Sequence, residues 1–189
     1  MHSQALAQQP PFIMPIPPTG EETRVAGVLS AIEQRLGFVP DGLRLYTLSP
    51  PLLENFVGNV AYFNGGGSGL RPILTAMIRY LVSWQSQCRF CIDMNEGFLV
   101  NMGLQLEEVR ATRAHPEVAP LPANEVTLLQ LALKSVEHAG ALTAADVENA
   151  RAKGWSDRDI FDAVVQAANN RAFNYVLRAF NVEQQGAFG

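Results

Sequence analysis

The sequence is poor in the residues that build disulfide scaffolds and metal centres. It contains two cysteines and three histidines among 189 residues, and the histidines stand far apart at His2, His115 and His138. Two cysteines do not make a disulfide scaffold, and no further Cys or His pair is spaced to complete a four-ligand zinc site. In a reducing compartment, two cysteines close in sequence indicate redox chemistry or metal binding instead.

Charge of either sign is also scarce. Charged residues make up 17% of the chain, the net charge is -4, and there is no basic run, so nothing favours binding to nucleic acid or to an acidic membrane surface. No apolar stretch reaches the roughly 18 residues of a membrane span, and no signal-peptide pattern is visible. We therefore expect a cytoplasmic protein. The low charged fraction predicts that part of its surface is hidden in a homo-oligomer.

Alternation of polar and apolar residues over a useful length is absent as well, so no strands are predicted. Hydrophobic residues make up 48% of the chain, enough for a core in a single domain of this length. Residues 1–20 are rich in Pro, Gln and Ala and predict either an extended N-terminal arm that lies on a neighbouring subunit or a disordered tail. Residues 21–189 predict a single all-α domain of seven or eight helices.

Apolar residues at helical spacing mark the helices, among them one that begins at Pro72 and ends near Trp84. The last third of the chain carries two capping-box signals. Thr143 and Asp146 have the required spacing, and the same device recurs at Ser156 and Asp159. The second signal predicts the start of a final helix that runs to about residue 180.

Cys88 and Cys91 lie three residues apart, and Asn95 follows four residues later. Positions i, i+3 and i+7 share one face of a helix, so these three side chains are predicted to project together. If Ser86 or Gln87 begins a new helix, both cysteines lie near its N-terminus, which lowers the pKa of a thiol. A peroxide would oxidise such a thiolate to a sulfenic acid, and the neighbouring thiol would condense with it to a disulfide.

Other roles for these residues, structural ones or zinc binding, remain open. The two cysteines could be small core residues, or zinc ligands completed from elsewhere. Trp84 could wall the site or pack in the core, and Arg89 could lower the pKa of a thiol or face solvent. Asn169, Asn170 and Asn174 are polar residues on an otherwise apolar helix, and they could hydrogen-bond within the core or line the site.

Taken together, the pattern resembles the alkylhydroperoxidase-D-like branch of the carboxymuconolactone decarboxylase superfamily. The likeness spans roughly residues 22 to 183 and rests on Leu70 to Trp84, Cys88-x-x-Cys91, Asn95, Gly103-Leu104, Gly37 to Pro40, Ser49 to Leu53, and Ser156 to Phe180. It implies an all-helical fold assembled as dimers, trimers or hexamers. It also implies peroxide reduction in which Cys91 attacks the peroxide and Cys88 resolves the intermediate. We expect neither a cofactor nor a metal.

Two positions differ from the motif of that family. Asn95 stands where the family has a His four residues after the second cysteine. Thr75 and Ala76 stand about twelve residues before the first cysteine, where the family has a Glu. These groups serve the family as a proton relay. Asn cannot titrate, although it can donate a hydrogen bond to a thiolate or a peroxide oxygen. We therefore expect slow or specialised peroxidase activity, or a different electrophile. Asp93 and Glu96 are expected to be solvated charges.

The sequence thus predicts a thiol-dependent peroxidase-like oxidoreductase, with a hydroperoxide as substrate and an unidentified thiol as reductant. The alternative is a non-catalytic or redox-sensing helical oligomer that binds a small ligand or partner, which the missing His and Glu favour. A decarboxylase or other lyase of the same superfamily is disfavoured, because those relatives do not rely on a C-x-x-C pair.

Overall fold

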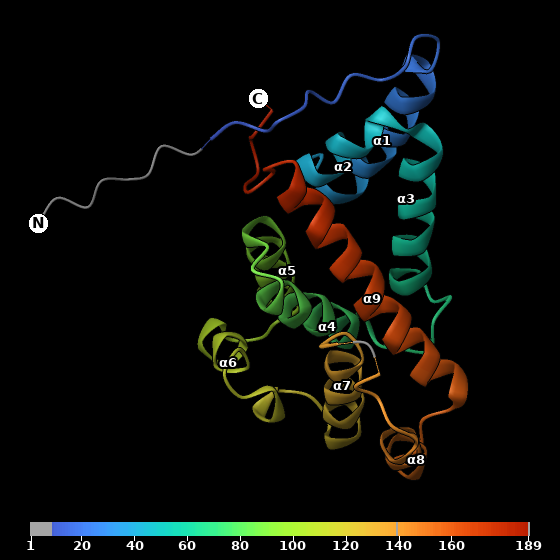
Figure 1. Ribbon diagram of the computed structural model, residues 1–189, viewed down its shortest axis with the longest axis vertical. Helices are drawn as coiled ribbons and strands as arrows, with labels where there is room; N and C mark the ends of the chain where they lie inside the picture. Colours follow the sequence, from blue (N-terminus) through green and yellow to red (C-terminus); the bar gives the residue numbers. More distant parts are fainter. Residues whose placement is uncertain (1–8, 139, 189) are drawn as a thin grey trace, which may run out of the picture. The chain divides into compact units, whose positions relative to one another are not determined.

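The computed structural model describes residues 9–138 and 140–188, and all regular structure in these ranges is helical (Figure 1). These residues form α1 (Glu22–Leu36), α2 (Asp41–Leu45), α3 (Pro50–Asn64), α4 (Pro72–Gln85), α5 (Arg89–Asn101), α6 (Leu106–Ala111), α7 (Ala123–Ser135), α8 (Ala144–Ala152), α9 (Asp157–Ala179), and 3-10 turns at Tyr46–Leu48 and Pro116–Val118. The predicted all-α class is confirmed, but seven or eight helices were too few. None of the described helices is long and apolar enough to span a bilayer.

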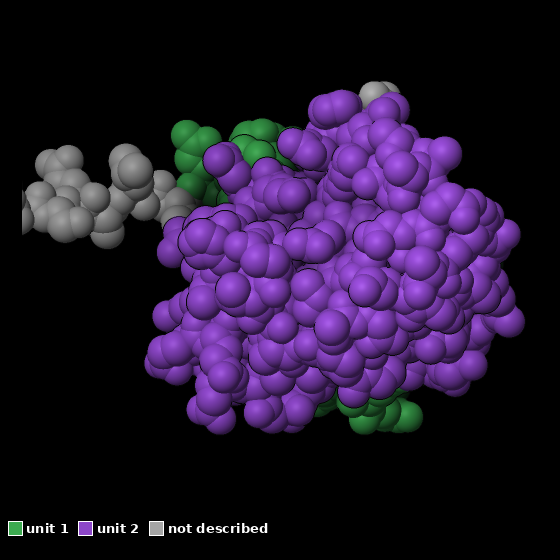
Figure 2. All heavy atoms as spheres, turned by 90° about the horizontal axis from the view of Figure 1, so that it is seen from below, with its two compact units in different colours: residues 1–54, 176–189 green, residues 55–175 purple. Residues whose placement is uncertain are grey.

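The chain divides into two compact units, which Figure 2 colours separately. One comprises residues 1–54 and 176–189, and the other comprises Asn55–Tyr175. α3 and α9 each contribute residues to both units. The prediction of one domain over residues 21–189 stays a prediction. Both cysteines belong to the second unit, so its internal packing positions the candidate site.

In the first unit, the N-terminal segment is hydrogen-bonded to the C-terminal segment. The backbone N–H of Phe12 donates to the carbonyl oxygen of Phe180 at 3.0 Å, and the Asn181 side chain donates to the carbonyl oxygen of Pro10 at 3.0 Å. Residues 1–8, which belong to the predicted N-terminal arm, lie outside the described residues. The part of the arm that is described is therefore held against the chain's own C-terminal segment.

The second unit is built around α4, which packs against α5 and α7. Every residue from Leu74 to Ser83 is buried except Arg79, which is half-buried. A helix that is apolar on nearly all sides is the centre of a helical domain rather than a surface element. Arg79 is therefore a charged residue within a buried run.

Both predicted capping boxes are confirmed. At the start of α8, the N–H of Asp146 donates to the Thr143 hydroxyl at 3.3 Å, and the Asp146 carboxylate accepts from the N–H of Thr143 at 2.8 Å. Ser156 and Asp159 make the same reciprocal pair at 3.2 and 3.1 Å before α9. Each box satisfies two backbone or side-chain donors that the helix start would otherwise leave open, which stabilises a helix by about 1 kcal/mol.

Candidate active site

A tight turn between α4 and α5 determines where the cysteines lie. The N–H of Cys88 donates to the carbonyl oxygen of Ser83 at 3.0 Å, and the N–H of Gln87 donates to that of Trp84 at 3.1 Å. Gln87 has a φ of +54°, in the left-handed region. These two hydrogen bonds around a left-handed residue form a Schellman motif, which ends a helix. The motif ends α4 and makes Cys88 the N-cap residue of α5.

The two cysteine side chains meet at the N-terminus of α5. Cys91 is the third residue of the helix, and its Sγ lies 2.9 Å from the Sγ of Cys88. Both residues are present as thiols. A disulfide bond has an S–S distance of about 2.05 Å, so the sulfur atoms need to approach by less than about 1 Å to close one. Both side chains are also buried, with 1% and 3% of their surface exposed.

Asn95 lies one helical turn after Cys91 and is buried. Its Nδ2 donates to the backbone carbonyl of Cys91 at 2.8 Å, and its Oδ1 accepts a hydrogen bond from Nε of Arg79 at 2.9 Å. Asn95 therefore joins the cysteine turn of α5 to the centre of α4. Because the backbone uses one of its two amide N–H groups, one remains for a thiolate or a peroxide oxygen.

Arg79 is the residue of this region that the sequence reasoning missed. The sequence did hold a signal, since Arg79 is the one charged residue between Leu74 and Ser83 in a helix that is otherwise apolar or neutral. Burial lowers the pKa of Arg79 to about 10, so the guanidinium is still protonated at neutral pH. Among the described residues, no carboxylate lies within ion-pair distance of it.

The positions where the family has its Glu are neutral and buried here. Thr75 and Ala76 are fully buried, and the Thr75 hydroxyl donates to the backbone carbonyl of Pro72 at 2.9 Å. Neither side chain can exchange a proton with the thiols near neutral pH. At the position of the family His this chain therefore has the amide of Asn95, which is bonded to the guanidinium of Arg79, and at the position of the family Glu it has no titrating group.

Two asparagines of α9 hydrogen-bond to the turn of α4 that contains Arg79 and Ser83. Asn170 donates to the carbonyl oxygen of Arg79 and to the Ser83 hydroxyl, both at 3.0 Å, and Asn174 donates to that hydroxyl at 3.3 Å. Both asparagines are buried, whereas Asn169 is exposed. Buried polar groups of this kind fix the position of the backbone that they bond. The polar residues that looked out of place on the final helix thus support the segment that carries Arg79.

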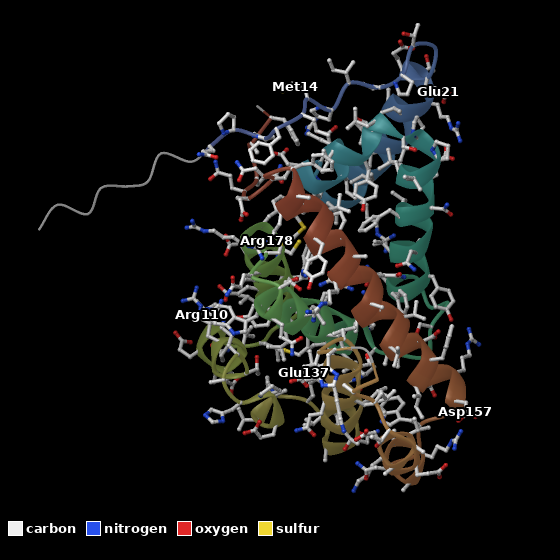
Figure 3. All side chains as sticks on the ribbon, in the orientation of Figure 1. Met14, Glu21, Arg110, Glu137, Asp157 and Arg178 are labelled. Atoms are coloured by element: carbon white, nitrogen blue, oxygen red, sulfur yellow. The ribbon has the colours of Figure 1, made fainter. Side chains whose placement is uncertain are left out.

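The next pair of residues along the same two helices forms a contrasting cluster. Glu96 is buried, and its carboxylate accepts from the Tyr80 hydroxyl at 3.0 Å, from Arg110 at 2.8 Å and from Arg113 at 2.7 Å. The hydrogen bond from Arg110 lowers the pKa of Glu96, and burial raises the pKa of Tyr80 to about 12. Figure 3 labels Arg110 on α6, beside α5. The expectation that Glu96 is a solvated charge was wrong, although Asp93 is exposed.

The remaining candidates lie away from the sulfur atoms or face solvent. The ring of Trp84 stacks on the guanidinium of Arg113 at 4.5 Å, and Arg89 is exposed. A hollow of about 420 Å³ lies between the end of α7 and α9, and its lining includes His138 and Arg171 but none of the predicted site residues. Within residues 9–138 and 140–188, no group of three or more His, Cys, Asp or Glu residues is placed to hold a metal ion.

No family model and no curated protein matches the sequence. An uncharacterized peroxidase-related protein from Silicibacter sp. TM1040 is 23% identical with a TM-score of 0.82, and the match covers 97% of this chain and 96% of that one. An alkylhydroperoxidase AhpD core protein from Ralstonia eutropha JMP134 is 20% identical with a TM-score of 0.76, over 96% and 93% of the two chains.

The chain has the alkylhydroperoxidase-D-like fold. The resemblance inferred from the sequence is therefore confirmed at the level of fold. A variant of the debrominase Bmp8, in complex with 2,3,4-tribromopyrrole, is 16% identical with a TM-score of 0.75, and the match covers 95% of each chain. Proteins of this fold therefore do not share one activity.

Proposed function

We propose that the chain is a thiol-dependent peroxidase-like oxidoreductase that reduces hydroperoxides through Cys88 and Cys91. The observation that carries the proposal is the 2.9 Å separation of the two sulfur atoms at the N-terminus of α5. Open backbone N–H groups and the helix dipole favour a negative charge at that end of a helix, and so favour a thiolate. Two thiols this close can form a disulfide with little movement of the backbone.

In the proposed cycle, the thiolate of Cys91 attacks one oxygen of the hydroperoxide. An S–O bond forms as the O–O bond breaks, and the alkoxide takes up a proton and leaves as the alcohol. The sulfur of Cys88 then attacks the sulfenic acid, so that the disulfide forms and water leaves. Two thiols have been oxidised and one peroxide reduced by two electrons. An external thiol reductant must restore the pair, and no step requires a cofactor or a metal.

The assignment of Cys91 as the attacking residue follows the resemblance, and the local geometry supports it. Cys91 is the third residue of α5 and lies within its first turn, whereas Cys88 is the N-cap residue. The open backbone N–H groups of the first turn favour a negative charge, so this position suits a thiolate on Cys91. Because Asn95, Thr75 and Ala76 provide no titrating relay, we expect turnover to be slower than in a relative with the complete motif.

The predicted homo-oligomer remains part of the proposal. On the extended segment before α1, the side chains of Phe12, Met14 and Ile16 are 65%, 60% and 70% exposed (Met14 is labelled in Figure 3). Three large apolar side chains in a row are costly to leave in water, so a second copy of the chain is expected to cover them. Sedimentation would show a monomer if this expectation is wrong.

The direct test is consumption of tert-butyl hydroperoxide with dithiothreitol as the reductant. Wild type should turn over, and Cys91→Ser should lose the activity. In the absence of dithiothreitol, Cys88→Ser should consume one peroxide and stop with a sulfenic acid on Cys91, detectable by dimedone labelling and mass spectrometry. Equal turnover in wild type and Cys91→Ser would end the proposal. Asp93→Asn, an exposed position on the same helix, serves as the control and should leave the rate unchanged.

The second candidate function is the redox-sensing or non-catalytic oligomer that binds a small ligand. The specific observation in its favour is the burial of both thiols, which limits access by a substrate. Thiol titration with a small alkylating reagent separates the two candidates. Slow alkylation at neutral pH in the folded protein, together with no peroxide turnover, would favour this second function over the first.

A different electrophile is a variant of the leading proposal. The likeness to the debrominase Bmp8 makes a brominated pyrrole a reasonable second probe in the same assay. Release of bromide that depends on Cys91, without peroxide turnover, would move the proposed chemistry from a peroxide oxygen to a halogenated carbon. The roles of the two thiols as the electron donors would be unchanged.

A further inference from the structure

Three arginines bond to side chains at the interface of α4 and α5, and Arg79 is paired very differently from Arg110 and Arg113. Arg113 donates to the Glu96 carboxylate at 2.7 Å and to the Tyr80 hydroxyl at 2.6 Å. Arg79 is half-buried in the middle of α4, and the side-chain partner it has among the described residues is the amide of Asn95. A guanidinium has five N–H donors, so most of the donor capacity of Arg79 is not used by an acidic group.

The side chains that hydrogen-bond to Arg79 among the described residues are all neutral. Asn95 faces it from α5, Asn170 from α9 bonds its carbonyl oxygen, and Ser83 lies one turn along its own helix. Side chains one turn apart on a helix have Cβ atoms about 6 Å apart, so Cys91 is the neighbour of Asn95 on the face that Arg79 contacts. An opposite charge within about 4–6 Å favours the ionised form of a group.

We propose that Arg79 supplies the fixed positive charge of the dithiol site, which stabilises the Cys91 thiolate and makes the site favour hydroperoxides that carry a carboxylate. A charge desolvated without an acidic partner is costly to a fold, and a thiolate or an anionic substrate would provide that partner. The choice of substrate rests on the proposed peroxidase function, but the effect on the thiol does not. A guanidinium stays charged across the physiological range, so this site needs no relay to keep its thiolate.

The effect on the thiol is tested by following the ultraviolet absorbance of the thiolate against pH in a Cys88→Ser background, where Cys91 is the single thiol. Arg79→Gln should raise the midpoint of the Cys91 thiolate titration by about one pH unit, which leaves tenfold less thiolate at neutral pH. Arg79→Lys should restore most of the difference, because it keeps the charge. Arg89→Gln is the matched control, since Arg89 is exposed beside the cysteines, and its midpoint should not move.

An unchanged midpoint in Arg79→Gln, or an equal shift in Arg89→Gln, would overturn the proposal. Circular dichroism shows whether Arg79→Gln folds. If it does not, Asn95→Asp decides the question, because it cancels the charge without removing the arginine. The midpoint must then rise in Asn95→Asp, and a midpoint at or below that of the background would be contrary to the proposal.

The substrate preference is tested by comparing turnover of a carboxylate-bearing hydroperoxide with that of tert-butyl hydroperoxide. Wild type should favour the anionic substrate several-fold, and Arg79→Gln should lose the preference. If neither is turned over, the peroxidase function fails, but the ratio of alkylation by iodoacetate to that by iodoacetamide still reports the charge. That ratio should fall about tenfold in Arg79→Gln if one pH unit of electrostatic stabilisation is lost. An equal ratio in wild type and Arg79→Gln would contradict the proposal.

Discussion

α4 and α5 contact each other through two consecutive residue pairs. The pairs differ in whether the charged side chain has a partner of opposite charge. Arg79 bonds to Asn95, and the next pair, Tyr80 and Glu96, lies beside it with the same separation in sequence. The Glu96 pair is closed, because two arginines balance the one carboxylate and the tyrosine adds a donor. The Arg79 pair is open, because the side-chain partner of its positive charge among the described residues is an amide.

We infer from this difference that the Glu96 pair has a structural role and that the Arg79 pair has a functional one. A buried carboxylate with three donors is satisfied and holds α4, α5 and α6 together. A desolvated cation without a counter-charge contributes less to stability, and such groups are typical of sites that bind or generate a negative charge. Asn95 of the open pair also donates to the backbone carbonyl of Cys91, so it is this pair that is joined to the cysteine turn.

The largest expected effect comes from breaking the closed pair. Glu96→Ala leaves Tyr80, Arg110 and Arg113 without their shared acceptor, so we expect a loss of about 3 kcal/mol in the free energy of unfolding. Urea denaturation followed by circular dichroism measures it. Glu108→Ala, an exposed glutamate on α6, is the matched control and should cost less than about 0.5 kcal/mol. Equal losses in the two variants would mean that the cluster is not structural.

A second substitution turns the open pair into a closed one. Asn95→Asp places a carboxylate against Arg79, so the positive charge is neutralised and the pKa of the Cys91 thiol should rise. We expect alkylation by iodoacetamide at neutral pH to slow about tenfold, which corresponds to one pH unit. The free energy of unfolding should change little, since the new ion pair offsets the lost hydrogen bond to the Cys91 carbonyl. Faster alkylation would contradict the comparison, and Asp93→Asn controls for a general change of charge on α5.

The sequence predicted the parts of the molecule that depend on local pattern. The all-α class, the two capping boxes and the grouping of Cys88, Cys91 and Asn95 follow from spacing along one chain segment, which the sequence displays directly. The partners of Asn95 and Glu96 could not be predicted, because they come from helices whose relative rotation the sequence does not reveal. Glu96 was expected to be solvated because its helical angle differs from that of the cysteine face, but its arginine partners come from fourteen and seventeen residues away in the sequence.

The two pairs should also respond differently to acid. The pKa of Glu96 is lowered in the folded protein, so its contribution to stability is full above the unfolded value of about 4.3 and is lost as the pH falls through the folded pKa. We expect a loss of about 1 kcal/mol for each unit of the shift between pH 7 and acid. Glu96→Gln should show a smaller acid-induced loss than wild type in urea titrations, whereas Asn95→Ala should keep the full loss. The same loss in wild type and Glu96→Gln would mean that other carboxylates dominate.

The smallest effect concerns the turn between α4 and α5, which aligns the two helices so that both residue pairs can form. Gln87 occupies the left-handed position of the Schellman motif, where glycine fits without steric cost. Gln87→Gly should therefore raise the free energy of unfolding by about 0.5 kcal/mol, since relief of the backbone strain exceeds the entropy that glycine adds to the unfolded chain. Gln87→Val should lower it, because a β-branched residue resists this conformation. If the side-chain pairs and not the turn fix the register, the alkylation rate of Cys91 stays at its wild-type value in Gln87→Gly. A rate that changed together with stability would show instead that the turn itself places the sulfur atoms.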